Sequence, residues 1–341
     1  MTMSDINWKE RALGLQERLD RLRLGVFDKD LLRRSVPLRA QAAARRAAAP
    51  DARERERRFG ELSPAYLEAS RDQAALMGNM RQTTIQGLPW WVPLPREDDA
   101  VYAEHALRQQ DFPYRAIAQT RELAIGGVML DVGANIGRMS IPRVILGDAV
   151  VAYCAEPDPV NYACLVRNIR DNGLGGLVLP DRVAVGSATG TAQLQRRRFA
   201  GGHRVIEAAP PEEAGTTAVP VVSLDDWIAR LGVHPDQISL VKVDVQGAEL
   251  RVLRGAPHLL ARRHIPWQVE IDPRLLEIGG SSVGDLIDLL RSNFTDFVHL
   301  DRHTTGQRVR PMADLADLFA RPDPSGENHT DILACNLAPA G

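Results

Sequence analysis

From about residue 122 to the C-terminus, short apolar runs alternate with helical patterns of hydrophobic residues. This alternation is typical of βαβ units and predicts an α/β fold with a mostly parallel sheet covered by helices. The last two runs are separated by a long loop without a clear crossover helix, which predicts one antiparallel strand. The expected strands are GVMLDV (127–132), VVAYCAE (150–156), VLPDRVAVG (178–186), ISLVKVDV (238–245), PWQVEI (266–271), DFVHLD (296–301) and DILACNL (331–337).

Smaller features of the same region fit this pattern. The segment PVNYACLVRNIRDNG predicts a helix with Gly173 as its C-cap, and Ser223 is expected to cap another helix together with Asp226. A second, smaller strand pair is expected in TAQLQ (191–195) and AVPVVSL (218–224).

The chain before this region differs in amino-acid composition and in hydrophobic pattern. Residues 1–82 are rich in Arg, Ala and Leu, and Leu15, Leu19, Leu22 and Val26 form a narrow helical stripe. We expect a helical extension that packs on the main domain or on a second copy of the chain. Residues 83–121, with Trp90 and Trp91, form a bridging segment that we interpret as a substrate cap, although burial is the commoner fate of such a tryptophan pair. The main domain is therefore expected to cover residues 122–341.

Composition narrows the function classes. The 341 residues carry a net charge of −2, so no overall field draws the chain to nucleic acid. No apolar run approaches the roughly 18 residues that span a bilayer, and the N-terminus lacks a signal-peptide core. The three cysteines have no metal-binding spacing and suggest a reducing compartment, so we expect a cytoplasmic protein without a zinc site.

The stretch MLDVGANIG (129–137) predicts a nucleotide-binding turn after the first strand of the main domain. In the dinucleotide pattern GxGxxG, the second and third glycines would stand where this chain has Asn135 and Arg138, which argues against NAD. Asp131 would repel a pyrophosphate, whereas it suits the amino group and sulfonium of S-adenosylmethionine. We therefore expect Asp131, Gly133, Asn135 and Gly137 to contact S-adenosylmethionine; a helix N-cap is the alternative role for Asp131.

Two further strand ends supply the rest of the expected cofactor site. Glu156 ends the second strand, where a carboxylate can accept both ribose hydroxyls, and Pro157 stops that strand. A surface carboxylate is the alternative for Glu156. Val183 is expected to lie against the adenine, and Asp181 to accept a hydrogen bond from its amino group.

The motifs DVGANIG, EPDP, LVKVDVQGAELRVLRGA and VEI resemble the FkbM family of S-adenosylmethionine-dependent methyltransferases. The DVQGAE segment is the most distinctive of them, and the resemblance covers roughly residues 83–337. It implies a Rossmann-like class I methyltransferase fold with a seven-stranded, mostly parallel sheet and one antiparallel strand. It also implies O-methylation of a small-molecule hydroxyl, on a polyketide or on a sugar of a glycan or glycolipid.

The general base is expected at a strand end or in the loop that follows it, because ligands bind at the carboxyl edge of such sheets. Asp244 and Glu270 are the first candidates, and His203, in a glycine-rich segment, is the third. Asp244 could instead cap the helix that begins near Gly247. Glu249 would lie in the first turn of that helix, where the helix dipole favours its negative charge. Mg²⁺ held by strand-end acids is an alternative, but no dedicated ligand spacing is present, so we expect no metal.

Three other functions compete with small-molecule O-methylation. A nucleic-acid methyltransferase is disfavoured by the near-neutral charge and the lack of an NPPY-like motif. A non-catalytic binding or assembly module would not need both Asp131 and Glu156. An NAD-dependent reductase is disfavoured by the altered glycine pattern.

Overall fold

The computed structural model describes residues 80–85, 87–94, 112–124, 126–197, 200–206, 216–300, 309–320 and 329–337. The predicted helical extension, with its expected contact to a second copy, lies almost entirely outside these residues. Part of the bridging segment 83–121 also lies outside them.

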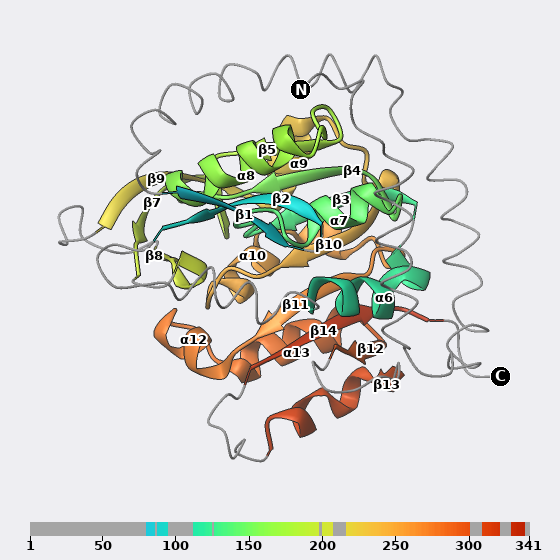
Figure 1. The fold of residues 1–341 in the computed structure, drawn as a ribbon. Coiled ribbons are helices and arrows are strands. Elements are labelled where there is room, and N and C mark those ends of the chain that lie inside the picture. Colours follow the sequence, from blue (N-terminus) through green and yellow to red (C-terminus); the bar gives the residue numbers. More distant parts are fainter. Residues whose placement is uncertain are drawn as a thin grey trace.

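The core of the molecule is an eight-stranded sheet (Figure 1). All seven expected strands contribute to this sheet, the run 178–186 only through its first half, and β14 is antiparallel to both of its neighbours, as predicted. An extra strand, β13, pairs antiparallel with β12 at one edge. In spatial order the strands are β5 (Val178–Asp181), β4 (Ala149–Ala155), β3 (Gly127–Val132), β10 (Ile238–Val243), β11 (Trp267–Ile271), β14 (Thr330–Cys335), β12 (Asp296–His299) and β13 (Val309–Pro311).

Helices cover both faces of this sheet, because both faces are apolar. Along β3, Val128, Leu130 and Val132 join one buried cluster, whereas Met129 joins the other. One face packs against α6 (Phe112–Ala124), α7 (Ser140–Ile145) and α8 (Pro159–Asp171). The other packs against α9 (Leu224–Leu231), α10 (Glu249–Arg254), α11 (Pro257–Leu260), α12 (Pro273–Ile278), α13 (Val283–Asn293) and the 3-10 helix η5 (Met312–Leu318).

The strand order creates a switch point between β3 and β10. From β3 the chain steps outward through β4 and β5, and after β10 it continues on the opposite side through β11. Ligands in open α/β sheets bind beyond the carboxyl ends of the strands at such a point. This order is that of a Rossmann-like class I methyltransferase fold, as predicted.

A second sheet lies beside the first. It contains β6 (Ala184–Gly186), β9 (Thr216–Ser223), β7 (Gly190–Gln195) and β8 (Arg204–Ile206), in that order. The predicted pairing of 191–195 with 218–224 is the antiparallel β7–β9 pair. The run 178–186, predicted as one strand, is instead divided between β5 and β6, which belong to different sheets. The 3-10 helices η3 (Ala200–Gly202) and η4 (Pro235–Gln237) complete this part.

Helix caps follow the sequence closely. The Ser223 side chain accepts a hydrogen bond from the backbone N–H of Asp226, as predicted. Helix α8 ends at Asp171 with Asn172 as its C-cap, and the expected cap residue, Gly173, follows with φ +66°. The cap therefore lies one residue earlier than predicted, and the left-handed glycine turns the chain away.

The bridging segment contains a hairpin of β1 (Met80–Ile85) and β2 (Leu88–Pro93) that packs on α8. Asn168 of α8 accepts a hydrogen bond from the Trp91 backbone N–H and donates to the Trp91 carbonyl. Asn168 also donates to the carbonyl of Ile136, 2.9 Å away, in the turn after β3. The Trp91 indole donates to Asp171, and Arg167 stacks on the ring, so Trp91 packs against α8. Trp90 is buried in the core.

Candidate functional site

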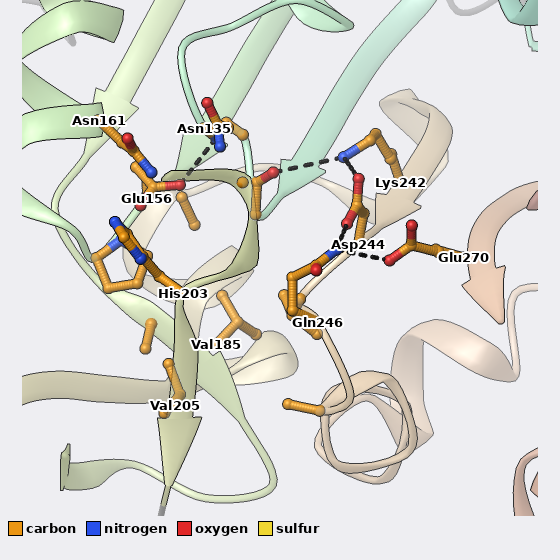
Figure 2. Close-up of a pocket in the computed structure, with 18 of the residues that line it drawn as sticks. Asn135, Glu156, Asn161, Val185, His203, Val205, Lys242, Asp244, Gln246 and Glu270 are labelled. Carbon is orange, nitrogen blue, oxygen red and sulfur yellow. Dashed lines mark hydrogen bonds and ion pairs between the residues drawn. The ribbon is translucent and has the colours of Figure 1, made fainter. Parts of the chain in front are cut away.

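A cavity of about 480 Å³ opens beyond the carboxyl ends of β3, β4, β10 and β11. Its size lies within the range of about 300–1,000 Å³ that is usual for small-molecule sites. Figure 2 shows two groups of polar residues facing each other across it, with Val185 and Val205 between them. We call the group of Asn135, Glu156 and His203 the β4 wall, and the group of Lys242, Asp244, Gln246 and Glu270 the β10 wall.

The turn after β3 joins the two walls. Gly133 has φ +77°, and a Cβ atom there would lie 1.9 Å from the carbonyl oxygen of Asp244. The backbone N–H groups of Gly133 and Ala134 both donate to the carbonyl of Ala155. Asn135 also has a positive φ, +53°, which Asn tolerates better than most residues. The turn is therefore fixed against β4 on one side and β10 on the other.

Glu156 forms the centre of the β4 wall. Its Oε2 accepts a hydrogen bond from the Asn135 backbone N–H and its Oε1 from the Asp158 backbone N–H, both at 2.8 Å. Burial and the charge of Asp158 raise the pKa of Glu156 to about 8, although the backbone hydrogen bonds oppose this shift. The side chain is thus held rigidly at the cavity surface, with acceptor capacity left for a ligand.

His203 also lies on the β4 wall, not beside Asp244 and Glu270 (Figure 2). Its Nε2 is 3.6 Å from Oδ2 of Asp158, and its Nδ1 accepts from the backbone N–H of Arg197. Arg196 forms a second ion pair with the same Asp158 carboxylate, at 2.7 Å. Burial lowers the pKa of His203, against the attraction of Asp158. Asp158 thereby ties the segment after β7 to the β4 wall.

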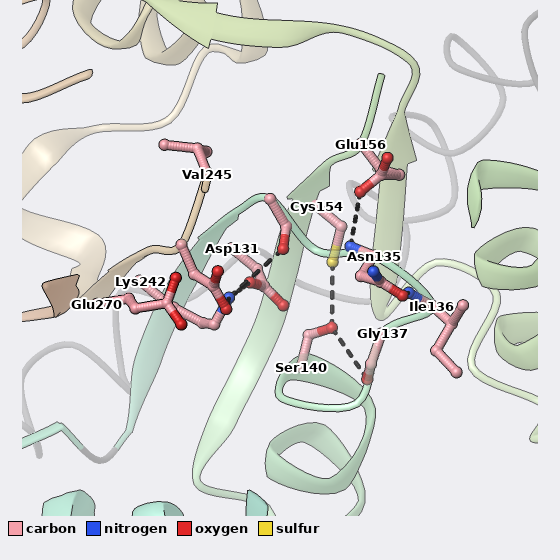
Figure 3. Close-up of polar contacts among 12 residues, drawn as sticks. Asp131, Asn135, Ile136, Gly137, Ser140, Cys154, Glu156, Lys242, Val245 and Glu270 are labelled. Atoms are coloured by element: carbon pink, nitrogen blue, oxygen red, sulfur yellow. Dashed lines mark hydrogen bonds and ion pairs between the residues drawn. The ribbon is translucent and has the colours of Figure 1, made fainter. Parts of the chain in front are cut away.

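A buried lysine organises the β10 wall. The Nζ atom of Lys242 is 3.3 Å from Oδ1 of Asp131 and 3.2 Å from Oδ2 of Asp244 (Figure 3). Burial alone would lower the pKa of Lys242, but the carboxylates of Asp244, Asp131 and Asp331 outweigh it and raise the pKa. Lys242 is therefore charged and held between the two acids.

Asp244 and Glu270 hydrogen-bond to each other and to the side chain of Gln246. The Gln246 amide nitrogen donates to Oδ1 of Asp244 at 3.0 Å and to Oε2 of Glu270 at 2.8 Å. Burial would raise the pKa of Asp244, but Lys242 and the Gln246 hydrogen bond lower it. Burial and the charge of Asp244 raise the pKa of Glu270 well above its usual value. The ionised form is therefore favoured in Asp244 and the protonated form in Glu270, so the two acids titrate as a coupled pair.

Most of the predicted site residues line this one cavity. Three predicted cofactor contacts do not. Asp131 is fully buried below the turn against Lys242, and a Cβ at Gly137 would meet the side chains of Leu165 and Ile141, so this glycine serves helix packing. Asp181 accepts hydrogen bonds from the side chains of Trp227 and Arg230 on α9. The predicted residues that do line the cavity are Gly133, Asn135, Glu156, Pro157, Val183, His203, Asp244 and Glu270.

The structure adds residues that were not predicted. The sequence does signal Lys242, because it is the one charged residue of the strand ISLVKV (238–243) and a charge buried in a strand needs a partner. Gln246 has no such signal. Glu249 lies in the first turn of α10, as predicted, and it also accepts hydrogen bonds from the backbone N–H groups of Val245 and Gly247. Burial raises its pKa to about 7.

The described residues contain no group of three or more His, Cys, Asp or Glu side chains placed to hold a metal ion. Within the same part of the chain, no helix has the length and apolar character needed to cross a membrane.

Comparison with known proteins identifies the domain. Residues 131–296 match the family model of the methyltransferase FkbM domain. The chain is 26% identical over 241 residues to the 31-O-demethyl-FK506 methyltransferase FkbM of Streptomyces tacrolimicus, covering 60% of this chain and 89% of that protein. It is 30% identical over 135 residues to the hexuronic acid methyltransferase AglP of Haloferax volcanii, covering 39% of this chain and about half, 51%, of that protein.

Among solved structures, the methyltransferase FkbM of Methylobacillus flagellatus aligns with a TM-score of 0.38 and 18% identity. That alignment covers 61% of this chain and 43% of the other. The segment that matches the family model begins at Asp131, the last residue but one of β3, and finishes where β12 begins, so it contains both walls of the cavity. Residues 131–296 therefore form an FkbM methyltransferase domain.

Proposed function

We propose that the cavity binds S-adenosylmethionine and that the protein transfers its methyl group to a hydroxyl of a small molecule. The observation that carries this proposal is the pairing of the two walls across one cavity. A rigid carboxylate, Glu156, faces a joined pair of acids, Asp244 and Glu270, beyond the switch point of an FkbM domain. The walls fit the two ends of this cofactor.

The β4 wall suits the adenosine part. Glu156 has both oxygens fixed by backbone donors, so its remaining lone pairs are set to accept hydrogen bonds from ribose hydroxyls. Between the walls, the apolar lining suits the flat adenine ring, and it comes from Val183, Val185, Leu194 and Val205. Asn135 fixes the near side of this wall through its backbone N–H.

The β10 wall suits a positive charge. Asp244 is ionised and lines the cavity beside Glu270, Asp272 and Asp331, and the nearby ammonium of Lys242 is already neutralised by Asp131 and Asp244. When bound, the cofactor supplies an electrophilic methyl group on a sulfonium, which becomes a neutral thioether after transfer. Acids at this wall would attract that charge and orient the methyl carbon toward the acceptor.

Proton removal from the acceptor falls to the same wall. An aliphatic hydroxyl is a weak nucleophile, and a base in reach accelerates such steps by about 10²–10⁴-fold. Asp244 and Glu270 are joined through Gln246, so a proton from the hydroxyl oxygen can be taken up by this pair. His203 lies on the other wall, where we assign it to holding the segment after β7 through Asp158.

The relatives support the acceptor class. One is named for a macrolide hydroxyl methylation and the other for a hexuronic acid, so we propose a polyketide or a sugar of a glycan or glycolipid as acceptor. All three cysteines are free thiols, which supports a reducing compartment such as the cytoplasm. We propose that residues 83–121 form a separate bridging unit. Its described hairpin packs on α8 and does not line the cavity. Pro113 of α6, in the same unit, lines the cavity.

Isothermal titration with S-adenosylmethionine and S-adenosylhomocysteine tests the proposal first. Transfer of a radiolabelled methyl group to panels of sugars, glycolipids and macrolides then tests the reaction. We expect binding of both ligands, and loss of transfer in Asp244→Asn/Glu270→Gln with binding of S-adenosylhomocysteine, which lacks the sulfonium charge, retained. Binding of neither ligand would favour a non-catalytic module, and binding of NADH instead would favour a reductase.

A further inference from the structure

Gln246 occupies an unusual position between two acids of neighbouring strands. Its amide nitrogen carries two hydrogens, and both are directed to carboxylates, one to Asp244 and one to Glu270. These acids are 26 residues apart in sequence, and the Gln246 side chain contacts both of them (Figure 2). The two carboxyl groups also hydrogen-bond to each other, so the donors of this one nitrogen reinforce a direct contact between them.

The backbone holds this side chain in place at some conformational expense. Gln246 has φ +57°, a left-handed conformation that residues with a Cβ rarely adopt. Gly247 follows with φ +102°, and a Cβ there would lie 2.2 Å from the carbonyl oxygen of Leu275 in α12. The Gly247 N–H donates to Glu249, so the loop is fixed from α10 and from α12. A strained conformation that is held this firmly indicates a role for its side chain.

The charges around the bridge are unequal. Lys242 is 3.2 Å from Oδ2 of Asp244 and stabilises the ionised form of that acid. Burial and the acids that surround Glu270 raise its pKa and favour its protonated form. The other titratable and charged groups that line this end of the cavity or act on the pair are Asp131 of β3, Glu249 of α10, Asp272 after β11, and His329 and Asp331 at β14.

We propose that Gln246 is a positioning residue of the methyl transfer: its carboxamide holds Asp244 and Glu270 as a pair that carries one proton, and a positive charge in the cavity drives that proton out. This inference rests on the proposed function. Binding of a cation next to the pair favours two ionised carboxylates over one, and the displaced proton passes to the solvent. The pair is then free to accept the proton of the acceptor hydroxyl when the methyl group is in place.

S-adenosylmethionine and S-adenosylhomocysteine offer a matched pair of probes. They differ by one methyl group and one positive charge, so the difference between them isolates the effect of the sulfonium. Contributions of Glu156 to pH dependence are common to both ligands and cancel in the comparison. Titration of each ligand from pH 6 to 9, in buffers of different ionisation enthalpy, gives the protons released on binding.

In the unmodified protein we expect S-adenosylmethionine to release more protons than S-adenosylhomocysteine near neutral pH, by up to about one per site, because a coupled pair titrates in steps. Gln246→Met keeps the length of the side chain but removes both donors. We expect it to shift this release to higher pH and to weaken S-adenosylmethionine about tenfold more than S-adenosylhomocysteine, the size of a lost charged hydrogen bond. Gln193→Met, the same change in β7 and outside the cavity lining, should leave both quantities unchanged.

A merely structural role for Gln246 would lower both affinities by the same factor at every pH, and that result would overturn the proposal. Glu270→Gln provides a second route if Gln246→Met does not fold. It removes the titrating group with little change of shape, so the difference in proton release between the two ligands should disappear. Persistence of that difference would also overturn the proposal. Failure of both ligands to bind would instead reject the proposed function.

Discussion

The two walls of the cavity hold their carboxylates in different ways. On the β4 wall, Glu156 is held mainly by backbone N–H groups of the turn after β3 and of the segment before α8, with the Asn161 side chain as a further donor. On the β10 wall, Asp244 and Glu270 are held by side chains, Gln246 and Lys242. Backbone donors come with the fold, whereas side-chain donors are specified one residue at a time. The first wall is therefore set by architecture and the second by local sequence.

The electrostatics differ in the same sense. Burial raises the pKa of Glu156 to about 8, and the groups that oppose this shift are hydrogen-bond donors, not a cation. Asp244 has the ammonium of Lys242 at 3.2 Å, and its pKa is lowered despite burial. A buried cation thus separates the protonation states of Asp244 and Glu270, whereas Glu156 is governed by burial.

Gly133 offers the most disruptive test, because it links the two walls. In Gly133→Ala, the new methyl group would lie 1.9 Å from a backbone oxygen of Asp244, which no side-chain rotation relieves. We expect the free energy of unfolding to fall by more than about 4 kcal/mol, which is exceptional for a single substitution. We also expect loss of S-adenosylhomocysteine binding.

Gly147→Ala is the matched control for this change. Gly147 has nearly the same φ, +74°, but nothing lies within 4 Å of the place that a Cβ atom would take. It should lose only about 1–2 kcal/mol from the left-handed conformation. Equal losses in chemical denaturation of the two variants would show that the close contact between the walls does not matter.

Lys242→Met tests the device that is specific to the β10 wall. It leaves Asp131 and Asp244 without their shared cation, and removal of one partner from a buried ion pair typically destabilises by about 3–5 kcal/mol. Urea unfolding measures this loss. The double variant Lys242→Met/Asp131→Leu should recover part of it, and a double variant no more stable than the single one would contradict the ion-pair account.

Glu156→Gln tests the β4 wall with a smaller expected effect. Loss of a charged acceptor should weaken S-adenosylhomocysteine binding by about 1.5–3 kcal/mol. With the pKa of Glu156 raised to about 8, the ionised acceptor is present above that pH and lost below it. Affinity of the unmodified protein should therefore rise with pH through about 8, and that of Glu156→Gln should not.

Asp181→Asn is the control for this wall, because Asp181 contacts Trp227 and not the cavity. Calorimetric affinity for S-adenosylhomocysteine should be unchanged in this variant. A loss as large as that of Glu156→Gln would restore Asp181 to the cofactor site.

Local patterns predicted much of this molecule. The strands, the antiparallel β14 and the Ser223 cap follow from hydrophobic periodicity and neighbouring residues, and so does the position of Glu156 at a strand end. The missed features depend on partners that are distant in sequence. Asp131 is engaged by Lys242, 111 residues later, and Asp181 by Trp227, 46 residues later. Periodicity carries no information about such pairs.

The position of Gln246 was unpredictable for a related reason. Its side chain is significant only because a left-handed backbone aims it at Glu270, a residue of another strand. The edge strand β13 and the division of residues 178–186 between two sheets likewise depend on tertiary packing.

The β1–β2 hairpin has a consequence for how the enzyme can be shortened. A fragment starting at residue 122 would retain all strands of the main sheet, yet Asn168 would lose both hydrogen bonds to Trp91. The same amide donates a hydrogen bond to the carbonyl of Ile136, so loss of the hairpin would also weaken the support of the turn after β3. A minimal functional fragment therefore has to begin before Met80.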